Sequence, residues 1–112
     1  MKLTDLRVRI NVHKIADSFT SSEVLEHTCE EFAEASAALI QYYRALGTMD
    51  KKLSERSEHV TEEIADALIM LEQLLHKNPW MRSEVEAWMV RKVKRTFERE
   101  GIEEMIPMEE DK

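Results

Sequence analysis

The sequence predicts an all-α protein, a small bundle of about four helices that is completed by oligomerisation. Only two glycines and two prolines occur in 112 residues, so few positions would interrupt a helix. Ala, Leu, Glu and Met are plentiful, and all four favour helices. A chain of this length is short for a large hydrophobic core, so we expect partner subunits to complete the burial of its most apolar helix.

The N-terminal region carries a mixed signal. The segment LRVRINV alternates apolar and polar residues in the manner of a strand, but a single strand would have no partner in this chain. We therefore expect a short helix over about residues 4–17. Thr20-Ser-Ser-Glu23 then fits a capping box, and Gly47 follows the apolar run that begins there. These two signals predict a long helix over about residues 21–46.

Two further helices are predicted in the second half of the chain. A polar linker, TMDKKLSERS, is followed by a helix that starts near Ser57 and ends at Asn78-Pro79. The next helix begins either at Pro79, with proline in its first turn, or at the capping box SEVE four residues later. Gly101 closes this helix.

Composition and charge exclude several classes of protein. A net charge of −7 argues against nucleic-acid binding, which needs a basic face. The single Cys29 excludes an intrachain disulfide and a paired-cysteine metal or redox site. With no secretory signal and no apolar run long enough for a bilayer, a cytoplasmic protein without a membrane partner is expected. We expect one domain over residues 1–100 and an acidic, flexible tail over residues 101–112.

Two pairs of acids stand at the entrance to the two most apolar segments. Glu31 and Glu34 lie in EEFAEASAALIQYY, and Glu63 and Asp66 lie in EEIADALIMLEQLL. Residues three apart share one face of a helix, where like charges repel each other. Either this face is solvated, or a hard cation holds the acids together. Mg²⁺ takes oxygen ligands and often joins carboxylates to substrate phosphates.

Helical phase favours a cleft over an open surface for these acids. Glu63 and Asp66 flank the apolar stripe of their helix, in line with Met70. That stripe consists of Val60, Ile64, Ala67, Leu68, Leu71, Leu74 and Leu75. Glu31 and Glu34 share a face with small residues that would let another helix approach closely. That face includes Ala38, Gln41 and Ala45, and the opposite, apolar face includes Leu25, Cys29, Phe32, Leu39 and Tyr43. A helix that is apolar on both sides is typical of the centre of a bundle, and we expect its cysteine to be packed there.

A basic helix supplies the opposite charge. Between Trp80 and Arg99 there are six basic and three acidic residues, a net charge of +6 − 3 = +3. Lys92, Arg95 and Arg99 fall on one helix face together with Trp88. A cationic stripe near a carboxylate cluster suits a metal-bound polyphosphate, because the cation and the basic side chains would share its oxygens.

These motifs resemble a known family. The order ExxE, a 28-residue spacer (residues 35–62) and ExxD resembles the MazG-like branch of the all-α nucleoside triphosphate pyrophosphohydrolases, a group with dimeric dUTPases and helical dCTP pyrophosphatases. EEIADALIMLEQL is similar to the second motif helix of small phage-type and Firmicute-type MazG-like proteins, and KVKRTFER is similar to the basic segment that follows it. The resemblance covers about residues 25–100, with a spacer at the long end for the family.

The resemblance implies hydrolysis of a (d)NTP to the monophosphate and pyrophosphate, with Mg²⁺ as cofactor and Mn²⁺ as the substitute cation. A carboxylate would act as base for the attacking water. The metal and catalytic residues would be Glu31, Glu34, Glu63 and Asp66. The phosphate-binding residues would be Lys92, Arg95 and Arg99. Glu30 and Glu62 would lie behind the ligands, although the choice between Glu30 and Glu31 stays open. The family forms dimers or tetramers, so the resemblance also implies a homodimer or a homotetramer.

The competing interpretation is a non-catalytic helical-bundle interaction protein or a degenerate family member. With 23 acids in the chain, ExxE and ExxD arise readily by chance, so the bare motifs favour a solvated surface. The ordered set of two acidic helices and one basic helix favours the enzyme. The four histidines are expected at the surface or at helix ends, and the Glu-x-x-His motif of a ferritin-like di-iron site does not occur in the sequence.

Overall fold

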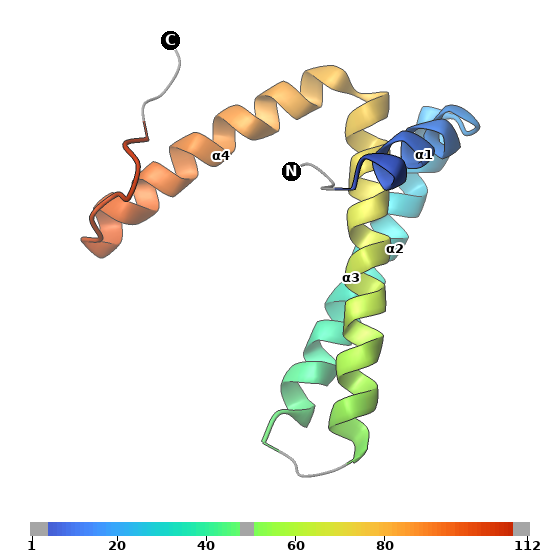
Figure 1. Ribbon diagram of the computed structural model, residues 1–112, viewed down its shortest axis with the longest axis horizontal. Helices are drawn as coiled ribbons and strands as arrows, with labels where there is room; N and C mark the ends of the chain where they lie inside the picture. The colour runs from blue at the N-terminus through green and yellow to red at the C-terminus, as the bar shows by residue number, and fades with distance from the viewer. Residues whose placement is uncertain (1–4, 48–50, 109–112) are drawn as a thin grey trace. The chain divides into compact units, whose positions relative to one another are not determined.

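The computed structural model describes residues 5–47 and 51–108 of the chain. These residues contain four α-helices and no strand, so the predicted all-α class is confirmed (Figure 1). The helices are α1 (Leu6–Asp17), α2 (Ser21–Ala45), α3 (Lys51–Lys77) and α4 (Pro79–Glu100). No helix in this part of the chain has the length and the hydropathy needed to cross a membrane. Completion of the bundle by other subunits stays a prediction.

The described residues divide into two compact units, one within residues 5–77 and the other within residues 78–108. In the first unit, α2 and α3 run side by side in opposite directions, and α1 packs against α3 (Figure 1). Helix α3 is therefore the central helix of this unit, because it contacts both of the others. The second unit contains α4. The predicted single domain over residues 1–100, with its flexible tail, stays a prediction.

Hydrogen bonds from the sequence's own capping residues define the first two helix starts. The Asp5 carboxylate accepts hydrogen bonds from the backbone amides of Arg7 and Val8 at 2.9 and 3.3 Å, which caps α1. The Thr20 hydroxyl accepts from the Glu23 amide at 3.1 Å, and the Glu23 carboxylate accepts from the Thr20 amide at 3.0 Å. The predicted capping box and the helical interpretation of LRVRINV are both confirmed.

Helix α3 begins earlier than predicted. It includes Lys51, whereas the sequence pattern predicted a linker and a start near Ser57. The segment KKLSERS lacks glycine and proline, and Lys, Leu, Glu and Arg are good helix formers. Arg56 Nη1 also donates a 2.6 Å hydrogen bond to Gln41 Oε1, which ties this turn to α2. Ser57 Oγ donates to the Leu53 carbonyl oxygen at 2.8 Å, a bond typical of a helix interior and not of an N-cap.

Helix α4 begins at Pro79, one of the two predicted alternatives, and ends at the predicted glycine. Gly101 adopts a left-handed conformation with φ 66°, and the Ile102 amide donates to the Phe97 carbonyl at 3.0 Å. Gly47, which follows α2, is also left-handed with φ 86°. None of the α4 residues is buried.

Small residues and acids occupy the faces through which α2 and α3 pack. Ala35 and Ala38 of α2 are only 8% and 2% exposed, as expected for a face that lets another helix approach closely. On α3, Val60, Ala67 and Leu75 of the predicted apolar stripe are buried, although Ile64 is 37% exposed. Met70, which lies on the flank that carries Glu63 and Asp66, is buried as well. The buried face of α3 therefore extends from the predicted stripe to this flank.

The opposite face of α2 is exposed in the single chain. Leu25, Phe32 and Leu39 are 52%, 43% and 47% exposed, and Tyr43 is 76% exposed. Cys29 is exposed as well, so the prediction that it is packed in a core is wrong for this chain. The central position that we predicted for α2 belongs to α3, because only one side of α2 is covered.

Two histidines join α1 to α3 in an arrangement that we call the His–carboxylate clasp. His13 Nε2 lies 2.8 Å from Glu72 Oε1, and His76 Nε2 lies 2.8 Å from Asp17 Oδ1. The two imidazole rings stack with centroids 4.1 Å apart and planes 8° apart. Their side chains are 30% and 29% exposed, and His76 lies in the last turn of α3, so both are partly exposed and take part in an inter-helix contact that we did not predict. Each helix contributes one histidine and one acid at i, i+4 spacing, a signal that we overlooked in the sequence.

Candidate functional site

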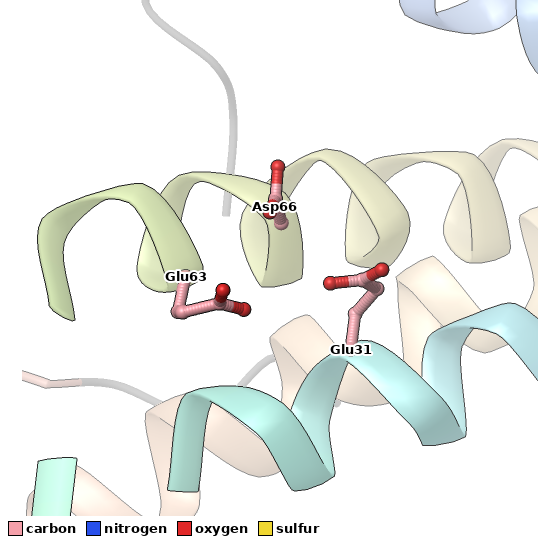
Figure 2. Close-up of side chains that lie close together, drawn as sticks. All are labelled: Glu31, Glu63 and Asp66. Atoms are coloured by element: carbon pink, nitrogen blue, oxygen red, sulfur yellow. The ribbon is translucent and has the colours of Figure 1, made fainter. Parts of the chain in front are cut away.

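Three carboxylates from two helices converge between α2 and α3. Glu31 comes from α2, and Glu63 and Asp66 come from α3 (Figure 2). One oxygen of each carboxylate lies within 4.8 Å of the corresponding oxygens of the other two. Within residues 5–47 and 51–108, they form the one group of three or more Asp, Glu, His or Cys side chains with ligand atoms this close. This spacing would allow the three oxygens to bind one metal ion together.

The packing faces of α2 and α3 explain how these acids come together. Glu31 lies on the packing face of α2 between the buried Thr28 and Ala35, so its side chain leaves the helix towards α3. Glu63 and Asp66 are one turn apart on α3, on the flank that also carries the buried Met70. The alanine beside Glu31 keeps the two backbones close enough for the carboxylates to approach each other.

Two oxygens in this group are buried without a hydrogen-bond partner among the described residues. They are Oε2 of Glu31 and Oε2 of Glu63. The Glu63 side chain is only 15% exposed. A buried polar atom that lacks a partner destabilises a fold by about 1–3 kcal/mol, and more when the group is charged. Such an atom calls for a partner, which a water molecule, a protonated neighbouring carboxyl group or a cation would supply.

The carboxylates raise one another's proton affinity. The pKa of Glu31 lies above its ordinary value, first because of burial and then because of the negative charges of Glu34, Asp66 and Glu63. The pKa of Glu63 is also raised, by burial first and next by Glu34. Like charges that are held together in a partly desolvated site favour any added positive charge, whether a proton or a metal ion.

His59 partly offsets the rise in the pKa of Glu63. Its Nδ1 atom lies 4.0 Å from Glu63 Oε1, and its charge lowers the pKa of that carboxyl. We expected His59 to be a surface residue, and its side chain is 47% exposed. Its place beside the acid group was not foreseen, although the i, i+4 spacing from Glu63 on one helix is the signal that reveals it.

The remaining predicted acids lie around the group. Glu34 is exposed and is not one of the three converging ligands, yet its charge and its hydrogen bonding raise the pKa of both Glu31 and Glu63. Glu30 is exposed and lies 4.0 Å from His27, measured from Oε2 to Nε2. Of the two adjacent glutamates, Glu31 is therefore the one that faces α3. Glu62 is exposed on α3.

The predicted phosphate-binding residues belong to α4, in the second unit. Lys92, Arg95 and Arg99 are exposed there. The Arg95 guanidinium carbon lies 6.0 Å from the centroid of the Trp88 ring, and that of Arg91 lies 4.7 Å from it. These arginines therefore flank an exposed aromatic ring in a cation–π arrangement. Their approach to a phosphate near the acids stays a prediction.

Comparisons with protein-family models, with curated proteins and with solved structures found no match to this chain. The resemblance to the MazG-like family therefore depends on the motifs in the sequence. Any functional assignment has to be argued from the geometry of the acid group.

Proposed function

We propose that this protein is a Mg²⁺-dependent nucleoside triphosphate pyrophosphohydrolase that converts a (d)NTP and water into a (d)NMP and pyrophosphate. The observation that carries the proposal is the convergence of Glu31, Glu63 and Asp66, two of which bury a carboxylate oxygen without a hydrogen-bond partner. Enzymes that cleave phosphoanhydrides need a site that binds Mg²⁺ and the phosphates together. The motif order and the basic face of α4 agree with that need.

The donor set fits Mg²⁺. Mg²⁺ prefers hard oxygen ligands, binds a few carboxylates and keeps its other positions for water and phosphate oxygens. Glu31, Glu63 and Asp66 would supply those carboxylates, and the exposed Glu34 stands beside them. Mn²⁺, which also favours oxygen ligands, would be able to replace Mg²⁺. When bound, the cation would neutralise negative charge on the phosphates and lower the barrier to attack on phosphorus.

The chain's own residues would handle the proton. Hydrolysis forms a bond between the water oxygen and a phosphorus atom and breaks the anhydride bond between the α- and β-phosphates. The water proton has to pass to a base. Glu34 suits this role because it is solvent-exposed and interacts with both Glu31 and Glu63 without belonging to the converging three.

The leaving pyrophosphate would need positive charge. We assign this role to Lys92, Arg95 and Arg99, which share one face of α4 and are exposed. Arginine can bind two phosphate oxygens at once, and lysine acts as a point charge. As the resemblance implies, we also propose a homodimer or a homotetramer as the active form.

The test is pyrophosphate release from a panel of ribo- and deoxyribonucleoside triphosphates, with Mg²⁺ or with EDTA. Glu31→Gln and Glu63→Gln keep the side-chain size but remove the charge. We expect each to lower kcat/KM on the order of 100-fold. Glu30→Gln and Glu62→Gln are the matched controls, because they are exposed neighbours of the same residue type, and we expect activity within about two-fold of wild type.

The second candidate function is a helical-bundle interaction protein without catalysis. The exposed apolar face of α2 favours it, since such faces mark association surfaces. Absence of pyrophosphate release from every nucleotide, by protein that is folded and binds Mg²⁺, would exclude the enzyme and leave this candidate.

A further inference from the structure

Helix α2 has a second seam on the side that α3 does not cover. We call it the outer seam, and its residues are Leu25, Cys29, Phe32, Ser36, Leu39 and Tyr43. All of them are exposed, and they follow one another at alternating spacings of four and three residues. An average spacing of 3.5 residues is the pattern by which one helix packs along another. The inner seam that packs on α3 has the same spacing, through Val24, Thr28, Glu31, Ala35 and Ala38.

We propose that two copies of this chain associate through antiparallel packing of their outer seams. The two-fold axis would pass near residue 34, so the numbers of facing residues add up to about 68. Phe32 then faces the partner's Ser36, and Cys29 faces the partner's Leu39. These two central contacts each set a large side chain against a small one, and Leu25 faces the partner's Tyr43 towards the ends of the seam. In a parallel pair, Phe32 would face the partner's Phe32 and Cys29 the partner's Cys29, which sets large against large and small against small.

Charges on the flank of the seam favour the same direction. Glu26 and Arg44 are 18 residues apart, which is five helical turns, so both lie on one flank of the outer seam. In an antiparallel two-fold pair, equal flanks face each other, and Glu26 would meet the partner's Arg44. In a parallel pair in register, Glu26 would lie level with the partner's Glu26, and Arg44 would lie level with the partner's Arg44. Opposite charges across an interface select its orientation.

The charge of α2 also argues against a membrane surface as the occupant. This helix has five glutamates and one arginine, a charge of −5 + 1 = −4 with neutral histidine. Apolar helix faces that bind anionic lipid are flanked by Lys and Arg instead. Glu34 lies on the opposite side of α2 from the outer seam by helical phase, so the pairing leaves the acid group accessible.

The native cysteine makes the register testable. In the antiparallel pair, the two Cys29 residues are offset by 10 positions along the axis, or about 15 Å, which is too far for a disulfide. Leu39→Cys places a second thiol directly opposite the partner's Cys29. We expect mild oxidation to convert most Leu39→Cys protein to a covalent dimer on a non-reducing gel, and to leave wild type and the matched seam variant Leu25→Cys monomeric on that gel.

Two results would overturn the proposal. A wild-type disulfide dimer would show parallel pairing, and a lack of cross-linking in Leu39→Cys would show that these surfaces do not meet. Sedimentation provides a second measurement: wild type is expected at twice the 13.2 kDa chain mass or more, and Phe32→Asp at the monomer mass with unchanged helical content. The pairing does not depend on catalysis. Loss of all nucleotide hydrolysis with intact cross-linking would refute the proposed function alone.

Discussion

Glu31 of α2 and Glu63 of α3 face each other across the helix interface, and each has one buried carboxylate oxygen without a hydrogen-bond partner among the described residues (Figure 2). Burial is the largest cause of the raised pKa of both, and neighbouring carboxylates are the next. Two carboxylates held in this way repel each other when both are ionised, so a ligand that neutralised the pair would stabilise the packing of α2 on α3.

Mg²⁺ should raise the thermal stability of the protein. A ligand that binds only the folded state adds RT ln(1 + [L]/Kd), which is ~1.4 kcal/mol at ten times Kd and corresponds to a Tm increase of about 5 °C or more for a domain of this size. Differential scanning fluorimetry with Mg²⁺ and with EDTA measures the effect. In Glu31→Gln the increase should disappear, and in the exposed control Glu62→Gln it should persist. An equal increase in both variants would exclude a site at Glu31.

In the absence of divalent cations, the contribution of Glu31 to stability should fall as pH rises from the acid range to neutrality. Glu31 has a folded-state pKa above its ordinary value, so the folded state retains a proton that the unfolded chain has lost. Its stabilising contribution is full below the unfolded-state pKa and is lost as pH rises through the folded-state pKa. Urea unfolding in EDTA between pH 4 and pH 8 measures how the free energy of unfolding changes with pH. This dependence should be weaker in Glu31→Gln than in wild type, and the variant should be more stable than wild type at pH 7.

The meeting of Glu31 with Glu63 and Asp66 follows from features that the sequence contains. Acids three residues apart share a face, and small residues beside Glu31 allow a close approach. The exposure of Ile64 could not be predicted, because periodicity places a residue on the apolar face of a helix but does not show how much of that face a neighbouring helix covers. The exposure of Cys29 was missed for a related reason. Periodicity identifies an apolar seam, but it does not distinguish a seam that packs within the chain from one that faces a second copy.

Loss of the His–carboxylate clasp should loosen α1. His13→Gln removes the ring that lies 2.8 Å from the buried carboxylate of Glu72 and stacks on His76, and we expect a loss of about 1–3 kcal/mol in the free energy of unfolding. His27→Gln is the matched control, because His27 is exposed and its Nε2 atom lies as far as 4.0 Å from Glu30 Oε2. The cost of this substitution should stay within about 0.5 kcal/mol. Urea denaturation followed by circular dichroism compares them. Equal losses in the two variants would contradict the role of the clasp.

Two proline substitutions test whether α3 begins at Lys51 or near Ser57. Ser57 lies in the second turn of the helix, so Ser57→Pro would remove a backbone hydrogen bond and clash with the preceding turn, at a cost of about 3 kcal/mol or more. If the helix began near Ser57, as the sequence pattern predicted, proline there would occupy the first turn and would be tolerated. Lys51→Pro is the matched control, because Lys51 is the first residue of the helix, and its cost should stay within about 1 kcal/mol. Urea unfolding of both variants measures the difference, and a similar stability for the two would place the start of α3 near Ser57.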